Sequence, residues 1–225
     1  MNNLSNTQQL QTYFREQRDI QNFPDNFRLR IHRALSWLEK AEALEMPQES
    51  DMKFISLWIA FNAAYAREFE NHIGKDRAIF NEFLVRICTF DKERVIYNLV
   101  WKKFSDSIRL LLDNKYIFQS FWDFHNGKIS EKEYILTEVK ERERFLSALE
   151  QQKTERILDV LFSRLYTLRN QILHGGATFG SKVNREQLRD GCNILAFLIP
   201  AILQIMMENH SKIDWGKPFY PVVRD

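Results

Sequence analysis

Glycine and proline are scarce in this chain, and long apolar runs are missing. Only 7 Gly and 5 Pro occur among 225 residues, which disfavours an all-β fold with many tight turns. The most apolar stretch runs from Ile194 to Met207 and is interrupted by Pro200 and Gln204. It is shorter than the roughly 20 residues that cross a membrane. We therefore predict a buried core helix there and no membrane association.

Cysteine is almost absent as well. Cys88 and Cys192 are far apart and lie in apolar helical patterns, so two buried free thiols are expected rather than a disulfide. This usage fits a reducing compartment. Residues 1–6 show no basic region followed by an apolar run, so no signal peptide is expected. These features together predict a cytoplasmic protein.

Net charge is also small. A formal charge of +2 excludes a general nucleic-acid binder that works through overall charge. One window differs, because residues 163–189 carry five basic side chains and only Glu186 as an acid, which makes it +4 and leaves −2 for the rest. The basic residues are Arg164, Arg169, Lys182, Arg185 and Arg189.

The chain is rich in residues that pack between helices, with 44% hydrophobic residues, 18 Phe and 5 Trp. Apolar residues recur at helical spacing, so the fold class is predicted to be all-α. The expected helices cover about 4–20, 25–46, 50–65, 76–88, 91–113, 115–125, 130–149, 154–174 and 184–209. The expected N-terminal caps are Asp25, Ser50 or Asp51, Ser130 with Glu133, and Asn184 with Gln187.

The chain is predicted to form one domain, 1–225. Charges become frequent in 74–153, but no linker rich in glycine, serine or proline separates this segment. It is interpreted as a helical elaboration of a helical core. The tail, 210–225, carries Trp215, Phe219 and Tyr220 and is predicted to be a strap held by aromatic contacts.

One helix end carries residues suited to phosphate chemistry. Arg169, Asn170 and His174 close an apolar helix, and Gly175 is expected to end it in a left-handed conformation. Arginine carries a permanent charge that can grip a phosphate, and histidine can move a proton near neutral pH. At 100° per residue, Arg169 lies inside the apolar arc of the helix, about 140° from His174. Asn170 lies close to His174.

Two interpretations of this helix end stay open at this point. An arginine in an apolar arc is costly unless it faces a cleft or meets a buried carboxylate, for which Glu39 or Glu42 is a candidate. His174 either moves protons or only interacts with the helix dipole. Asn62, in the most apolar helix, is by default a satisfied core amide and alternatively a partner of Arg169.

Three cations follow the helix end: Lys182, Arg185 and Arg189. They are candidates for holding RNA phosphates, and a solvated basic face is the alternative. His32 is expected to be a solvated or interface histidine.

No metal or cofactor is expected. The remaining histidines have no Cys or His partner at ligand spacing: His72, His125 and His210. The sequence also contains no glycine-rich phosphate loop and no Gly-x-Ser-x-Gly motif.

The spacing of Arg169, Asn170 and His174 at the end of a long helix resembles the Arg-x4-6-His motif of HEPN domains. Residues 30–38 and 54–66 resemble the opening helix pair of such domains, and 168–176 followed by the helix from Asn184 is similar to the Apea-like HEPN group. The resemblance covers about 25–73 and 154–209. It implies a HEPN-like helical bundle with 74–153 inserted.

The resemblance also implies an activity. HEPN domains form homodimers in which two motif copies face each other across a composite cleft, and they cleave RNA without metal. His174 would transfer a proton as the ribose 2′-OH attacks the adjacent phosphate, Arg169 would stabilise the phosphate charge, and Asn170 would orient either group. Such enzymes serve as toxins or antiphage effectors and can have an antitoxin or regulatory protein as partner. Where one related toxin group has a modified tyrosine, this chain has Gly176, so that regulation is not expected.

Two alternatives remain open. The first is a non-catalytic HEPN module that binds RNA or a partner protein. The second is a helical scaffold in which Arg169 is buried in an ion pair.

Overall fold

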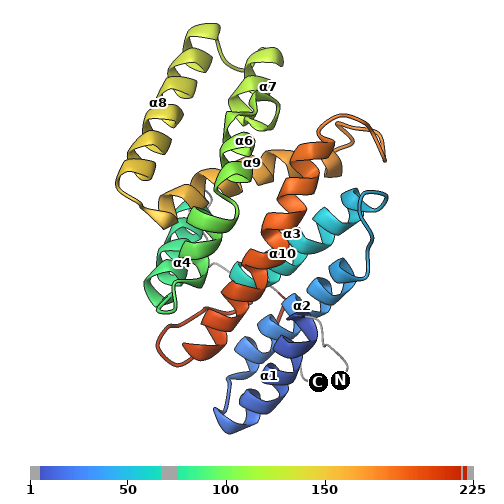
Figure 1. The fold of residues 1–225 in the computed structure, drawn as a ribbon, viewed down its shortest axis with the longest axis vertical. Helices are drawn as coiled ribbons and strands as arrows, with labels where there is room; N and C mark the ends of the chain where they lie inside the picture. The colour runs from blue at the N-terminus through green and yellow to red at the C-terminus, as the bar shows by residue number, and fades with distance from the viewer. Residues whose placement is uncertain (1–5, 67–75, 219, 222–225) are drawn as a thin grey trace.

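The fold is an assembly of helices, as predicted. The computed structural model describes residues 6–66, 76–218, 220 and 221, and within these ranges it contains α-helices, one π-helical and one 3-10 segment, and no strand (Figure 1). The helices of the first and last parts of the chain are α1 (Asn6–Ile20), α2 (Asp25–Glu42), α3 (Ser50–Tyr65), α9 (Thr154–Leu173) and α10 (Arg185–Glu208). Those of the middle part are α4 (Asp76–Phe90), α5 (Val95–Asn98), α6 (Ser105–Asp113), α7 (Gln119–His125) and α8 (Glu131–Glu150).

Helix α10 is the central element. It packs against α1, α2, α3, α4, α5 and α6, and it includes the buried stretch predicted from Ile194 to Met207. It is the one helix of the described residues that is long and apolar enough to cross a membrane, and most of it is buried inside the protein. Side chains from Leu10 in α1 to Trp215 in the tail join it in one core cluster.

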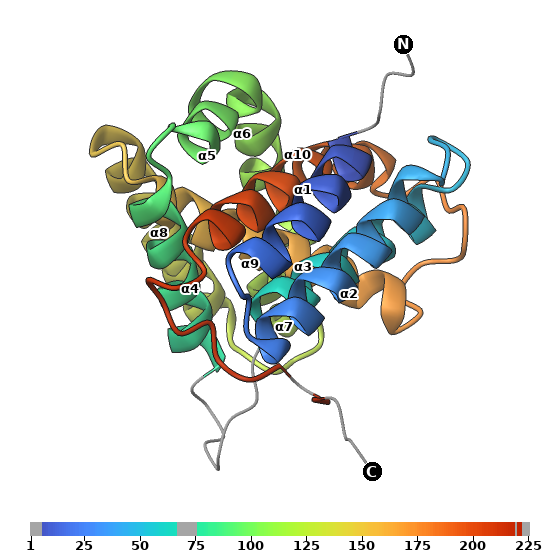
Figure 2. The ribbon, with the colours of Figure 1, turned by 90° about the horizontal axis from the view of Figure 1, so that it is seen from below.

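Helices α2 and α3 form an antiparallel pair beside α10, and α9 crosses behind them (Figures 1 and 2). The apolar character of α3 on nearly every face follows from this position, since α2, α9 and α10 surround it. Asn62 of α3 is half-buried, and its backbone carbonyl accepts the N–H of Ala66.

The segment 76–153 contributes to the same core. Leu84 and Ile87 of α4, Ile96 of α5 and Leu111 of α6 are buried in the cluster that α9 and α10 share. Helices α7 and α8 lie further out, at the upper edge of the molecule in Figure 1. The segment therefore extends the core through α4–α6 and adds a peripheral pair, α7 and α8.

The prediction of a single helix over 91–113 is wrong. The chain turns at Arg94, whose φ is 55°, and the carboxylate of Asp91 accepts the backbone N–H groups of Val95 and Tyr97. A short helix α5 therefore begins at Val95, continues as a π-helical turn over Leu99–Lys103, and is followed by α6. A side-chain cap of this kind is not visible in apolar periodicity.

The predicted caps have mixed outcomes. Ser130 and Glu133 form the reciprocal capping box at the start of α8, as predicted. Asp25 is not a cap, because Pro24 holds that position. Ser50 and Asp51 are the first two residues of α3 rather than its cap, which is Glu49.

The tail is held by backbone acceptors as well as by an aromatic ring. Trp215 is buried against Phe83, with ring centroids 6.2 Å apart. The buried guanidinium of Arg30 donates to the carbonyl of Gly216 at 3.2 Å and to the carbonyls of Ala64 and Ala66 at 2.8 and 2.7 Å. Arg30 thereby closes the end of α3 and fixes the strap. His72 and Phe219 lie outside the described residues.

Candidate functional site

The helix end that carries the motif is closed by glycine, as predicted. Gly175 has a φ of +70°, its N–H donates to Ile172, and the N–H of Gly176 donates to the carbonyl of Gln171 at 2.8 Å. This double closure satisfies carbonyls that the last turn of α9 would otherwise leave free. His174 holds the cap position, so it stands where the helix stops and the loop begins.

Arg169 is half-buried and has a neutral partner. Its Nη1 donates to Oδ1 of Asn170 at 2.8 Å, and its guanidinium lies 5.8 Å from the ring centre of Tyr166. Nε of Arg169 is buried without a hydrogen-bond partner. Across the described residues Arg169 forms no ion pair, so its charge is not neutralised by a neighbouring carboxylate.

The carboxylates considered as partners of Arg169 are engaged elsewhere. Glu39 accepts from Gln11 at 3.0 Å, and Glu42 accepts the backbone N–H of Thr7 at 3.3 Å. Of the two interpretations left open for Arg169, the one in which it meets Glu39 or Glu42 is therefore not supported. Both carboxylates lie on α2, near α1, and hold these two helices together.

His174 is exposed and stands apart from the other two motif side chains. Only its backbone N–H bonds to the motif, at 3.0 Å to the carbonyl of Asn170. Oδ1 of Asn170 accepts from Arg169, and within the described residues Asn170 forms no hydrogen bond with the His174 side chain. The structure thus brings the side chains of Arg169 and Asn170 together and leaves His174 at the start of the loop between α9 and α10.

Gln171 is a site residue that the sequence did not reveal. Its Nε2 donates to the carbonyl of Tyr116 at 2.6 Å, and its Oε1 accepts Nδ2 of Asn184 at 3.0 Å. It therefore fixes the end of α9 to the segment before α7 and to the start of α10. Asn184 occupies the N-cap position of α10, but its φ is 58° and its side chain makes no cap hydrogen bond. The predicted capping box of Asn184 and Gln187 therefore does not form.

Two of the five cations in the basic window have acid partners from other elements. Arg185 forms a bidentate ion pair with Asp51 of α3, with N–O distances of 2.7 and 2.8 Å. Arg164 is buried, lies 3.3 Å from Glu141 of α8 and stacks on Phe118. The local charge counted along the sequence is therefore partly neutralised in the fold.

The other two cations beyond the helix end stay at the surface. Lys182 is exposed in the loop, and Arg189 is exposed with Asp190 at 3.5 Å. Arg185 is engaged by Asp51 and holds the loop in place. Lys182 and Arg189 are therefore the more accessible phosphate contacts.

The Asp51–Arg185 ion pair should make the stability of the fold depend on pH in the acidic range. The hydrogen bond from Arg185 lowers the pKa of Asp51, and the backbone N–H of Gly180 lowers it further. A carboxyl with a depressed pKa stabilises the fold above its unfolded pKa of about 3.9, and this contribution is lost as pH falls through the folded value. Asp51→Asn should therefore cost about 2 kcal/mol at pH 7 and progressively less below about pH 4, as measured by urea unfolding.

Asp190→Asn is the matched control, because Asp190 makes only a loose pair with exposed Arg189. It should change the free energy of unfolding by less than about 0.5 kcal/mol at either pH. A constant difference between wild type and Asp51→Asn from pH 7 to pH 3 would contradict the assignment.

Apolar side chains surround the motif at the surface. Tyr166 and Leu173 on α9 and Phe179 and Val183 in the following loop are exposed by 51%, 48%, 75% and 64%. A group of exposed apolar residues on one part of a protein is typical of a contact surface.

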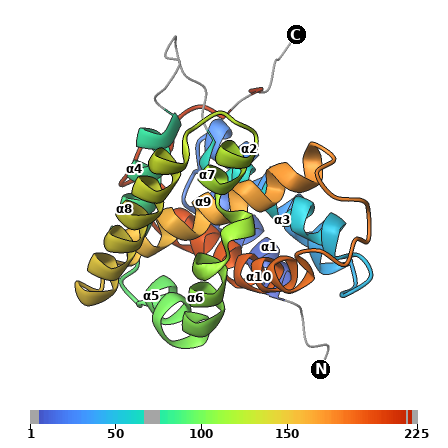
Figure 3. The same ribbon diagram turned by 90° about the horizontal axis from the view of Figure 1, so that it is seen from above.

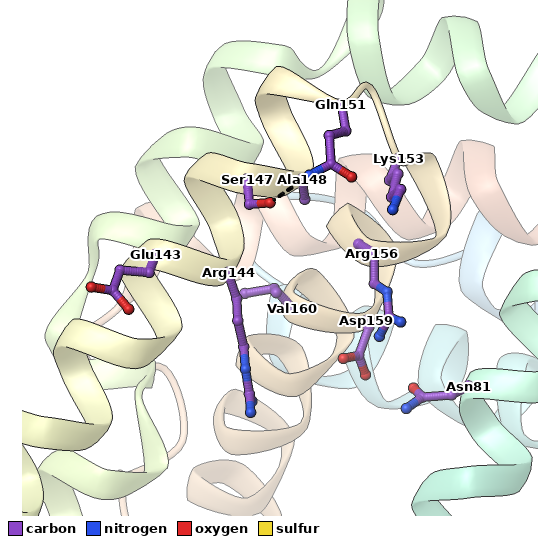
Figure 4. Close-up of a pocket in the computed structure, with 10 residues that line it drawn as sticks. All are labelled: Asn81, Glu143, Arg144, Ser147, Ala148, Gln151, Lys153, Arg156, Asp159 and Val160. Atoms are coloured by element: carbon purple, nitrogen blue, oxygen red, sulfur yellow. Dashed lines mark hydrogen bonds between the residues drawn. The ribbon is translucent and has the colours of Figure 1, made fainter.

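A hollow lies at the other end of α9 from the motif, between α4, α8 and α9 (Figure 4). Its volume is about 630 Å³, and its wall carries Arg144, Lys153 and Arg156 with Glu143 and Asp159. The lining has both charge signs and no aromatic ring, so it offers no surface on which a base would stack. It is separate from the motif.

Neither cysteine is suited to nucleophilic chemistry. Both are free thiols, as predicted, and burial raises the pKa of Cys88 and of Cys192 to about 12. In the part of the chain that the structure describes, no three His, Cys, Asp or Glu side chains gather to hold a metal ion.

The chain matches no protein-family model, and neither a curated protein nor a solved structure is significantly similar to it. Its function is therefore inferred from the residues and geometry at the end of α9.

Proposed function

We propose that this chain is a metal-independent endoribonuclease of HEPN type. His174 takes the proton from a ribose 2′-OH, the oxygen attacks the adjacent phosphorus, and the P–O5′ bond breaks. The products are a 2′,3′-cyclic phosphate and a 5′-OH, and the 5′ oxygen is protonated as it leaves. A role as a toxin or antiphage effector, with an antitoxin or regulatory protein as partner, belongs to the same proposal.

One observation carries this proposal: Arg169 has a permanent charge and no carboxylate partner in the described chain. Among the residues that the structure describes, its only hydrogen-bond partner is the neutral amide of Asn170, and its Nε is buried without an acceptor. An unpaired guanidinium in a half-buried position is costly to the fold. A phosphate in its transition state would supply the missing charge and the missing acceptor.

The position of His174 supports the proton-transfer role. The side chain is exposed at the end of α9, and the left-handed Gly175 leaves open backbone beside it. Nothing lies within 4 Å of the position that a Cβ on Gly175 would take. A nucleic-acid backbone can therefore approach the imidazole closely.

A second copy of the chain would complete the site. Arg169 and His174 project about 140° apart on α9, so one helix presents them to a common phosphate poorly. The exposed Tyr166, Leu173 and Phe179 provide an apolar surface for a homodimer around the motif. In that dimer Lys182 and Arg189 border the cleft and hold flanking RNA phosphates.

The test is RNA cleavage by purified protein in the presence of EDTA. His174→Ala should lower the cleavage rate by about 10²–10⁴-fold, because the proton-transfer group is removed. His125→Ala is the control, since His125 is an exposed histidine on α7 outside the motif, and it should cleave like wild type. Equal rates for wild type and His174→Ala would remove the mechanism.

A second candidate function is a non-catalytic module that binds RNA. It is favoured by the absence of a hydrogen bond between Asn170 and the His174 side chain in the single chain. Tight RNA binding by wild type without any cyclic-phosphate product would establish this function in place of cleavage.

A further inference from the structure

Helix α8 has two separate faces that are both suited to packing. Its inner face, which includes Tyr134, Phe145 and Ala148, is turned toward α7 and α9, and Tyr134 stacks on Phe124 with ring centroids 5.5 Å apart. Its outer face carries Ile135, Val139 and Leu146, each 48–49% exposed. Among the described helices, α8 packs mainly against α7 and α9, at the edge of the molecule (Figures 1 and 3).

The outer residues form a continuous stripe. Ile135, Val139, Arg142 and Leu146 follow one another at intervals of four, three and four residues. At 100° per residue they fall within about 60° of each other, and the centre of the stripe lies about 120° around α8 from the centre of its inner face. This spacing is that of a helix which packs against a second helix over three turns.

The charges along the stripe distinguish between partners and orientations. A second α8 that runs parallel would place Arg142 against Arg142 and Lys132 against Lys132, which is repulsive. An antiparallel copy, with its two-fold axis between Val139 and Arg142, places Ile135 against the partner's Leu146 and Val139 against the partner's Arg142. In that register Arg142 also faces the partner's Glu138, and Lys132 faces the partner's Glu150.

We infer that α8 is a self-association surface, on which a second copy of this chain docks antiparallel through Ile135, Val139 and Leu146. Each opposite-charge pair occurs twice because the interface is two-fold symmetric. The charge pattern thus selects a second copy of this chain in one orientation.

This interface is distinct from the one around the motif, and the inference does not rest on the proposed function. Helix α8 contacts the motif helix from its N-terminal end as far as Arg164, which pairs with Glu141 and stands five residues before Arg169. If both interfaces form, each chain has two different two-fold contacts, and dimers join into tetramers or longer assemblies.

The test is the concentration dependence of molar mass, by light scattering or sedimentation, in the full chain. Val139→Lys should remove this two-fold contact and weaken self-association about 100-fold, because it puts a second cation against the partner's Arg142 at the centre of the apolar stripe. Val85→Lys is the matched control, since Val85 on α4 is also exposed by 49%. It should assemble like wild type.

Charge exchange tests the orientation independently of folding. Lys132→Glu alone should weaken self-association, and Lys132→Glu combined with Glu150→Lys should restore it. RNA cleavage, if present, should be lost in His174→Ala and unchanged in Val139→Lys. The inference is overturned if wild type and Val139→Lys have the same mass over the whole concentration range, or if the double exchange fails to restore the self-association that Lys132→Glu removes.

Discussion

Replacement of Arg30 by methionine is expected to lower the free energy of unfolding by about 4 kcal/mol. Arg30 is 1% exposed and donates to the carbonyls of Ala63, Ala64, Ala66 and Gly216 at 3.4, 2.8, 2.7 and 3.2 Å. Methionine removes the charge but leaves those acceptors without their donors. Urea unfolding at pH 7 measures the loss.

Arg33→Met on the same helix is the control. Arg33 donates to the carbonyl of Tyr220 at the surface, where water replaces the lost donor. It should cost less than about 1 kcal/mol. Equal losses for the two variants would contradict the role of Arg30 as the link between the end of α3 and the tail.

Replacement of Arg169 by methionine should lower RNA cleavage without lowering the free energy of unfolding. RNA cleavage should fall by about 10²–10³-fold, because the group that stabilises charge on the phosphate is lost. The free energy of unfolding should stay within about 0.5 kcal/mol or rise, since no carboxylate loses a partner and a buried unpaired Nε is removed. Cleavage and unfolding are measured on the same preparation.

Arg164→Met is the comparison for Arg169→Met. Arg164 lies on the same helix and pairs with Glu141 at 3.3 Å, so its loss leaves a half-buried carboxylate without its ion pair. It should lower stability and leave cleavage intact below the unfolding transition. A stability loss for Arg169→Met as large as for Arg164→Met would show that Arg169 is structural.

The sequence predicted the elements that depend on local pattern. The all-α class, the start of α9 at Thr154, the capping box of Ser130 and Glu133, and the left-handed Gly175 are all confirmed. Each depends on residues within one turn or on a sustained apolar period.

The features that the sequence did not predict involve side-chain partners, most of them distant in the sequence. Arg185, a candidate for holding RNA phosphates, forms an ion pair with Asp51, which is 134 residues away. Gln171 links two segments through Tyr116 and Asn184, and neither contact has a sequence signal. The break at Arg94 arises from the carboxylate of Asp91, which apolar periodicity does not report.

The motif itself is intermediate between these cases. Its position at the end of α9 was predictable, and so was the unusual placement of Arg169 in the apolar arc. The choice of partner was not predictable from the sequence, because it depends on whether the fold brings a carboxylate near Arg169. Within the described residues Arg169 bonds to Asn170 alone, which is a result of the three-dimensional arrangement.

The most direct test of the proposed activity is the chemistry of the RNA ends. A 5′-labelled single-stranded RNA is incubated with wild-type protein in EDTA, and the products are analysed for their termini. We expect 2′,3′-cyclic phosphate and 5′-OH ends, with no such products from His174→Ala. Products with 3′-OH and 5′-phosphate ends, or intact RNA with wild-type protein, would contradict the account.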